Sequence, residues 1–154
     1  MILASGSPRR KELLQMLEVP FQVLVSDTKE VITKNEPTEV TKELSYQKAM
    51  AVAGQVEEGI IIGADTVVSI DGKILGKPAD TEEAREMIYK LQGKNHMVYT
   101  GVTVIAKSDD MVSASSFAEG TKVNVAPMTE NEIEAYISTD EPYDKAGAYG
   151  IQGL

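Results

Sequence analysis

Three cations follow a short run of small polar residues, at a point where a helix is expected to begin. Arg9, Arg10 and Lys11 come directly after Ser-Gly-Ser-Pro, in which Ser7 suits a helix N-cap and Pro8 the first helical position. Cations are unfavourable at this end of a helix, because its dipole and free N–H groups attract anions. The pattern therefore suits a phosphate cradle. The alternative is equally compatible with the pattern: the three cationic side chains extend into water and bind nothing.

A carboxylate, Asp65, interrupts the most apolar run of the chain, residues 59–70. Three consecutive isoleucines, followed by two valines, predict a central strand buried on both faces. A buried carboxylate is unfavourable unless it is paired, binds a metal or faces a cleft. Its small neighbours Gly63 and Ala64 leave room for a ligand. The alternative is a bulge or a hydrogen-bonded structural aspartate.

A lysine is expected to return towards this strand. Asp71-Gly72 predicts a type I′ hairpin turn, after which the chain runs back antiparallel. Lys77 follows the second, short strand and would approach Asp65. A surface lysine at a strand end is the alternative.

Two more charged residues belong to the same candidate set. Lys48 lies close to the apolar stripe of a helix expected over residues 38–56, so its amine can extend outward or reach into a cleft. Glu30 lies in a polar stretch over residues 26–39. The alternative, for each of these residues taken alone, is an ordinary solvent-exposed charge with no functional role.

The last segment, residues 141–154, is rich in glycine and alanine, which predicts close approach of its backbone to another group. Asp144, Lys145 and Gln152 supply a carboxylate, an amine and an amide there. These groups suit recognition of a nucleotide or a metal. A tight structural connection before a final strand is the alternative.

Several strands and helices would have to position these side chains. The first helix is expected to bury a stripe of Leu13, Leu14 and Leu17, and capping boxes predict helices that begin near Asp80 and Thr129. Apolar and alternating patterns predict strands over residues 1–3, 21–25, 59–70, 73–75, 97–107 and 113–126. We expect one α/β domain over residues 1–154.

Composition excludes several classes of function. The 154 residues carry a net charge of −9, which argues against a nucleic-acid-coating surface. No apolar run is long enough for a membrane span or forms a signal peptide. There is no cysteine, which fits the cytoplasm, and one histidine, His96, which we expect at the surface in a turn.

Together the motifs resemble the Maf family of nucleoside triphosphate pyrophosphatases. The matching segments are Ser-Gly-Ser-Pro-Arg-Arg from residue 5, Gly-Ala-Asp-Thr from residue 63, Gly-Lys-Pro from residue 76 and Asp-Lys-Ala-Gly-Ala-Tyr-Gly-Ile-Gln-Gly from residue 144. They occur in the family's order and span nearly the whole chain. The resemblance implies a mixed, twisted α/β sheet with flanking helices and a central cleft, related to the inosine-triphosphate pyrophosphatases.

The resemblance also implies an activity: metal-assisted hydrolysis of a nucleoside triphosphate to a monophosphate and pyrophosphate. The family's active-site set matches Ser7, Arg10, Glu30, Lys48, Asp65 and Lys77. Matches at Arg9, Thr66 and Gln152 imply the branch that prefers dTTP and UTP. Asp65 and Glu30 would hold the divalent metal, Mg²⁺ first and Mn²⁺ second. We favour Asp65 as general base, with a metal-ligand role as the alternative.

Two features depart from the family pattern. Many relatives carry an acidic pair where this chain has Lys29 before Glu30. Family members also continue beyond the glycine-rich segment with further strands and a helix, which the sequence ending at Leu154 lacks.

The resemblance implies a homodimer that acts on nucleoside triphosphates. From the composition we expect a cytoplasmic protein that binds neither nucleic acid nor membrane. The alternative function is a nucleotide-binding regulator of septum formation without significant turnover.

Overall fold

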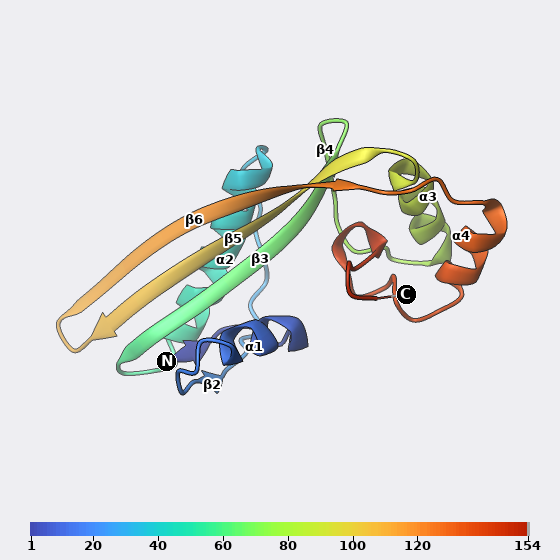
Figure 1. Cartoon of the computed structure of the whole chain (residues 1–154). Coiled ribbons are helices and arrows are strands. Elements are labelled where there is room, and N and C mark those ends of the chain that lie inside the picture. The colour runs from blue at the N-terminus through green and yellow to red at the C-terminus, as the bar shows by residue number, and fades with distance from the viewer. Residues whose placement is uncertain (154) are drawn as a thin grey trace. The chain divides into compact units, whose positions relative to one another are not determined.

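The computed structural model describes residues 1–153 (Figure 1). Its strands are β1 (Ile2–Leu3), β2 (Gln22–Val23), β3 (Gly59–Ile70), β4 (Lys73–Leu75), β5 (Asn95–Ser108) and β6 (Met111–Asn124). Its helices are α1 (Pro8–Gln15), α2 (Pro37–Ala53), α3 (Thr81–Leu91) and α4 (Glu130–Ile137), followed by the 3-10 turn η1 (Ala146–Ala148).

The strands form one mixed sheet in the order β2-β1-β3-β5-β6, with β4 paired to β3. β1 runs parallel to both β2 and β3, whereas β3 and β4 form an antiparallel hairpin. The hairpin turn has positive φ at Asp71 (50°) and Gly72 (74°), as a type I′ turn requires. The expected mixed α/β fold and this hairpin are confirmed.

The chain folds as two compact units. Unit 1 comprises residues 1–65 and 100–119, and unit 2 comprises residues 66–99 and the chain from 120 onward. β3, β5 and β6 each contribute residues to both. One domain over residues 1–154, and a central cleft, stay predictions.

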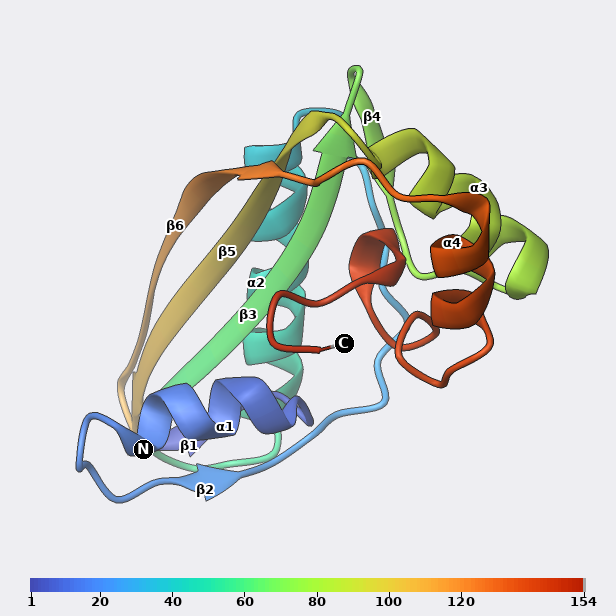
Figure 2. The same cartoon turned by 45° about the vertical axis from the view of Figure 1, so that its right-hand side comes forward.

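In unit 1, α2 lies along strands β3 and β5 (Figure 2). It can pack closely on them because both strands have glycine at the contact. A Cβ at Gly63 of β3 would lie 2.4 Å from the Ser45 carbonyl oxygen, and one at Gly101 of β5 would lie 2.3 Å from the Thr41 backbone. Small and branched side chains fill the space beside this contact: Ala4, Ala49, Val52, Ala53, Ile61 and Ile105.

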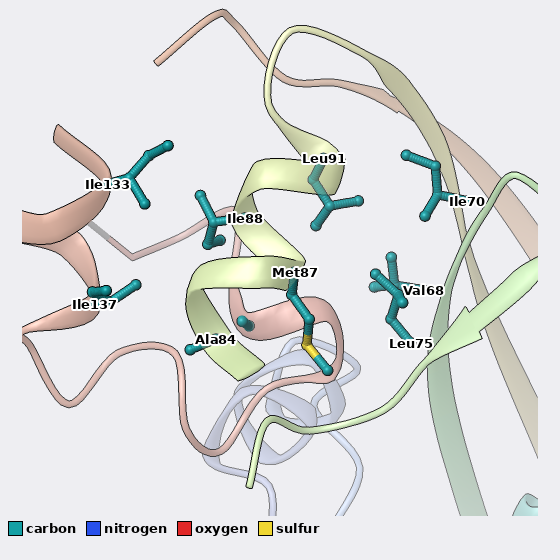
Figure 3. Packing of buried hydrophobic residues seen from close by; sticks show 10 residues of the cluster. Val68, Ile70, Leu75, Ala84, Met87, Ile88, Leu91, Ile133 and Ile137 are labelled. Carbon is teal, nitrogen blue, oxygen red and sulfur yellow. The ribbon is translucent and has the colours of Figure 1, made fainter. Parts of the chain in front are cut away.

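Unit 2 has its own apolar core, formed where α3 and α4 pack together beside the β3–β4 hairpin (Figure 3). Ile88 and Leu91 of α3 and Ile133 and Ile137 of α4 are buried in it. Both helices begin where the sequence predicted. The Asp80 side chain accepts a hydrogen bond from the Glu83 N–H, and Thr129 and Glu132 form a reciprocal capping box.

The predicted leucine stripe of the first helix is wrong. Leu14 is buried, but Leu13 is 48% and Leu17 62% exposed. α1 ends at Gln15, so Leu17 lies outside the helix. A helix of eight residues can bury only a few side chains. The spacing of the apolar residues did not show how short the helix is.

The prediction of a surface turn at His96 is also wrong. β5 begins at Asn95, two residues earlier than expected, and the next residue, His96, points inward with 3% exposure. Its Nε2 lies 2.5 Å from the Tyr149 hydroxyl. Burial lowers the pKa of His96, so its neutral form is favoured. This contact ties the glycine-rich segment to β5 within unit 2.

Within residues 1–153, no helix is both long and apolar enough to cross a membrane.

Candidate active site

The N-terminus of α1 forms as the sequence predicted. The Ser7 hydroxyl accepts a hydrogen bond from the Arg10 N–H at 3.5 Å, and Pro8 occupies the first turn. The first arginine does not point into the protein. Arg9 is exposed and forms an ion pair with Glu12 at 3.2 Å along the helix surface.

The second arginine, Arg10, is held inside unit 1. Its Nη1 donates to the Ala64 carbonyl oxygen at 2.8 Å and to the Ser5 hydroxyl at 3.2 Å. Burial lowers the pKa of the guanidinium, and the negative charge of Asp65 opposes that shift. An arginine nevertheless remains protonated at neutral pH. The structure thus fixes one cation between the N-terminus of α1 and β3.

A lysine joins two carboxylates beside this arginine. Lys48 of α2 donates from Nζ to Asp65 Oδ1 of β3, and the same Nζ lies 3.1 Å from Glu30 Oε1. The Asp65 side chain is 11% exposed, and that of Glu30 is 48% exposed. The structure therefore brings together predicted site residues from three separate segments of unit 1.

The surroundings of Asp65 oppose its negative charge on balance. Burial is the largest influence and raises the pKa of its carboxyl group. The hydrogen bond and positive charge of Lys48 lower that pKa, Glu30 raises it further and Arg10 lowers it. A carboxylate with a raised pKa is better suited to accept a proton than an ordinary aspartate.

Glu30 and Asp65 could supply two oxygen ligands to a magnesium ion. Glu30 and Asp65 both reach the Lys48 ammonium, so the two carboxylates already converge on one positive charge. Among the residues that the structure describes, no group of three or more His, Asp or Glu side chains could hold a metal alone. Mg²⁺ commonly takes one or two carboxylates and fills its other positions with water and phosphate oxygens.

The other predicted site residues belong to unit 2. Lys145 is held locally: its Nζ donates to the Glu141 carbonyl oxygen at 2.7 Å and to Asp144 Oδ1 at 3.0 Å. The remaining three are Thr66, half-buried in β3, Lys77, exposed between β4 and α3, and Gln152, exposed after η1.

Three further residues contribute to the site but were not predicted from the sequence. Ser5 is buried and accepts the hydrogen bond from Arg10, and its place in the Ser-Gly-Ser motif could have suggested this. Gln47 and Glu43 bind the backbone of the segment that carries Glu30. No sequence signal marks these two, because polar residues on a surface helix ordinarily face water.

Comparison with known proteins identifies close relatives. The family profile described as Maf-like protein matches residues 1–154. A Bacillus cytotoxicus protein named dTTP/UTP pyrophosphatase is 52% identical over 153 residues, covering 99% of this chain and 78% of the relative. A Bacillus cereus protein of the same name is 49% identical over the same share of each chain.

A solved structure shares the fold at much lower sequence similarity. The Staphylococcus aureus Ham1 protein superposes with a TM-score of 0.51 at 14% identity, covering 80% of this chain and 70% of that one. This similarity concerns the fold alone and agrees with the predicted fold class. The identity to the two Bacillus proteins and the match over the full sequence are decisive for the family. The chain belongs to the family of Maf-like proteins.

Proposed function

We propose that this chain hydrolyses dTTP and UTP to the nucleoside monophosphate and pyrophosphate. One observation of the structure carries the proposal: the Lys48 ammonium contacts the carboxylates of both Asp65 and Glu30, in the unit that also holds Arg10. Two Bacillus relatives of about half-identical sequence, each named dTTP/UTP pyrophosphatase, support the choice of substrates.

The cations of unit 1 would bind the triphosphate. The N-terminus of α1, with Ser7 as its cap, presents N–H groups and a positive dipole end to phosphate oxygens. Arg10 adds a guanidinium held by Ser5 and the Ala64 carbonyl, so its orientation is set before substrate arrives. Lys48 would neutralise negative charge as it develops on the leaving pyrophosphate.

Asp65 would act as the general base. It accepts a proton from a water molecule whose oxygen attacks the α-phosphorus, and the bond from that phosphorus to the oxygen bridging to the β-phosphate breaks. The pair of electrons leaves with pyrophosphate. Burial raises the pKa of Asp65 above the ordinary value in the metal-free protein, which makes this carboxylate a stronger base than an ordinary aspartate.

Glu30 would hold a divalent metal, Mg²⁺ by preference and Mn²⁺ as the alternative. Asp65 would be its second ligand in the alternative to the general-base role. When bound, such an ion neutralises phosphate charge and makes a water molecule more acidic. Convergence of the two carboxylates on Lys48 supports this assignment.

The family membership supports roles for residues outside this cluster. Lys77 would neutralise negative charge on the leaving pyrophosphate. The substrate would be bound by Arg9, Thr66, Asp144, Lys145 and Gln152. These roles follow the resemblance of the motifs in this sequence to those of the family.

We further propose that the protein acts in the cytoplasm as a homodimer and binds neither nucleic acid nor membrane. A net charge of −9 supports the exclusion of nucleic acid, since phosphate backbones bind cationic surfaces. The absence of cysteine from the sequence fits a reducing compartment.

Product analysis across a panel of nucleoside triphosphates tests this function. With Mg²⁺ present, we expect stoichiometric pyrophosphate and monophosphate from dTTP and UTP, faster than from the other canonical or methylated nucleotides. Chelation of the metal should abolish release. Release of single phosphate from the γ position, or nucleotide binding without turnover, would contradict the proposal, and the latter would favour a regulatory role.

A further inference from the structure

The segment that carries Glu30 has no secondary structure of its own. It lies between β2 and α2, and residues 26–35 form neither helix nor strand. Backbone of this kind has many accessible conformations, and ordering it carries an entropic cost at each residue. Glu30 can therefore stay beside Lys48 only if other contacts fix the neighbouring backbone.

Gln47 supplies the nearest of these contacts. The Val31 N–H donates to Gln47 Oε1 at 2.9 Å, and Gln47 Nε2 donates to the Val31 carbonyl oxygen at 2.6 Å. The amide thus uses both its acceptor and its donor on one residue of the segment, as a paired residue in an antiparallel ladder would.

The positions of these partners in the sequence connect them to the site. Gln47 directly precedes Lys48, and Val31 directly follows Glu30. Consecutive Cα atoms are about 3.8 Å apart, so fixing Val31 against Gln47 restricts Glu30 to the neighbourhood of Lys48. The 3.1 Å contact between Glu30 Oε1 and Lys48 Nζ is formed under that restriction.

A second attachment lies one helical turn earlier on α2. The Thr33 N–H donates to Glu43 Oε2 at 2.9 Å, and the Thr33 hydroxyl donates to Glu43 Oε1. Residues four apart share one face of a helix. Glu43 and Gln47 therefore bind Thr33 and Val31 from the same face of α2.

We propose that Gln47 is a positioning residue for catalysis: its amide clamps Val31 and thereby holds the Glu30 carboxylate in place beside Lys48. The proposal rests on the proposed function, because it assigns Gln47 a role through Glu30. The Gln47 amide uses its acceptor and a donor on Val31, and the proposal gives Gln47 no contact with the substrate, so its effect on turnover must depend on Glu30. A residue that merely stabilises the fold would lack that dependence.

The variant Gln47→Met removes both hydrogen bonds while keeping the length of the side chain. We expect kcat/KM for dTTP to fall roughly tenfold, the lower range for losing a group that orients a metal-binding residue. Gln55→Met is the matched control, because Gln55 is exposed and its amide donates a long hydrogen bond of 3.4 Å to the Ala51 carbonyl oxygen in the last turn of α2. This control should retain wild-type activity.

A double-mutant cycle separates positioning from general stability. In a Glu30→Gln background, Gln47→Met should cause no further loss of kcat/KM, since the group that it positions is already gone. A full additional tenfold loss in that background would overturn the proposal.

Hydrogen exchange at the Val31 amide reports on the clamp without any turnover. We expect exchange to be roughly tenfold faster in Gln47→Met than in wild type or Gln55→Met, as loss of one exposed hydrogen bond implies. Unchanged exchange would overturn the proposal whatever the kinetics show. If the wild-type chain releases no pyrophosphate, both the proposed function and the catalytic role of Gln47 are refuted. Faster exchange at Val31 in Gln47→Met would in that case still show that Gln47 holds this segment.

Discussion

Asp65 shows how single side chains set the properties of this site. Burial opposes its charge, and the adjacent cations Lys48 and Arg10 compensate only in part, so the pKa of its carboxyl group stays raised. The same cations are the groups that we assign to phosphate. This buried carboxylate is thus a candidate general base, and its burial in the charged form destabilises the folded state.

A carboxyl titration of the metal-free protein by ¹³C NMR tests this directly. We expect the pKa of Asp65, assigned with Asp65→Asn, to lie above the ordinary value of an aspartate. In Glu30→Gln it should be lower than in wild type, because a neighbouring negative charge is removed.

The sign of the effect on stability follows from the same shift. The folded pKa lies above the unfolded one, so the folded state binds this proton more tightly. The contribution of Asp65 to the free energy of unfolding is therefore most favourable at low pH. It declines as pH rises from the unfolded pKa through the folded pKa. A pKa of Asp65 at or below the ordinary value of an aspartate would contradict this description.

At the scale of elements, the site depends on the close packing of α2 against β3. Lys48 projects from α2 and Asp65 from β3, and Gly63 lies two residues before Asp65. The Ser45 carbonyl oxygen and Ala49 of α2 would lie 2.4 Å and 2.9 Å from a Cβ at Gly63. A methyl group there would push the strand away from the helix and lengthen the contact between the two charged groups.

We therefore expect Gly63→Ala to reduce both stability and activity. Overpacking of this kind costs about 1–3 kcal/mol of unfolding free energy, measurable by urea denaturation. In protein that remains folded, kcat/KM should also fall. Gly54→Ala is a suitable control, because Gly54 has φ of −67° at the end of α2 and no neighbour closer than 3.6 Å to the added Cβ. Gly63→Ala with wild-type stability would show that the packing is not tight.

Local signals predicted those elements whose determinants are local. The Asp71-Gly72 turn and the capping box at Thr129 require only neighbouring residues, and both formed as expected. The buried face of α1 and the burial of His96 depend on which distant segment packs nearby. Spacing of apolar residues could not supply that information.

At the scale of the whole molecule, the sequence motifs lie far apart in the chain, and the fold brings some of them together. Arg10, Glu30, Lys48 and Asp65 were each predicted as site residues, and in unit 1 they form one charged cluster. The clamp by Gln47 could not be predicted, because it matches a helix residue to the backbone of an irregular segment.

The most direct test of the account compares nucleotide binding and pyrophosphate release in Asp65→Asn. The change keeps the size of the side chain but removes the base, so we expect turnover of dTTP with Mg²⁺ to fall by roughly 10²–10⁴-fold. Nucleotide binding, measured by calorimetry, should persist through Arg10 and the N-terminus of α1. Turnover at the wild-type rate in Asp65→Asn would contradict the central claim that this carboxylate carries the chemistry.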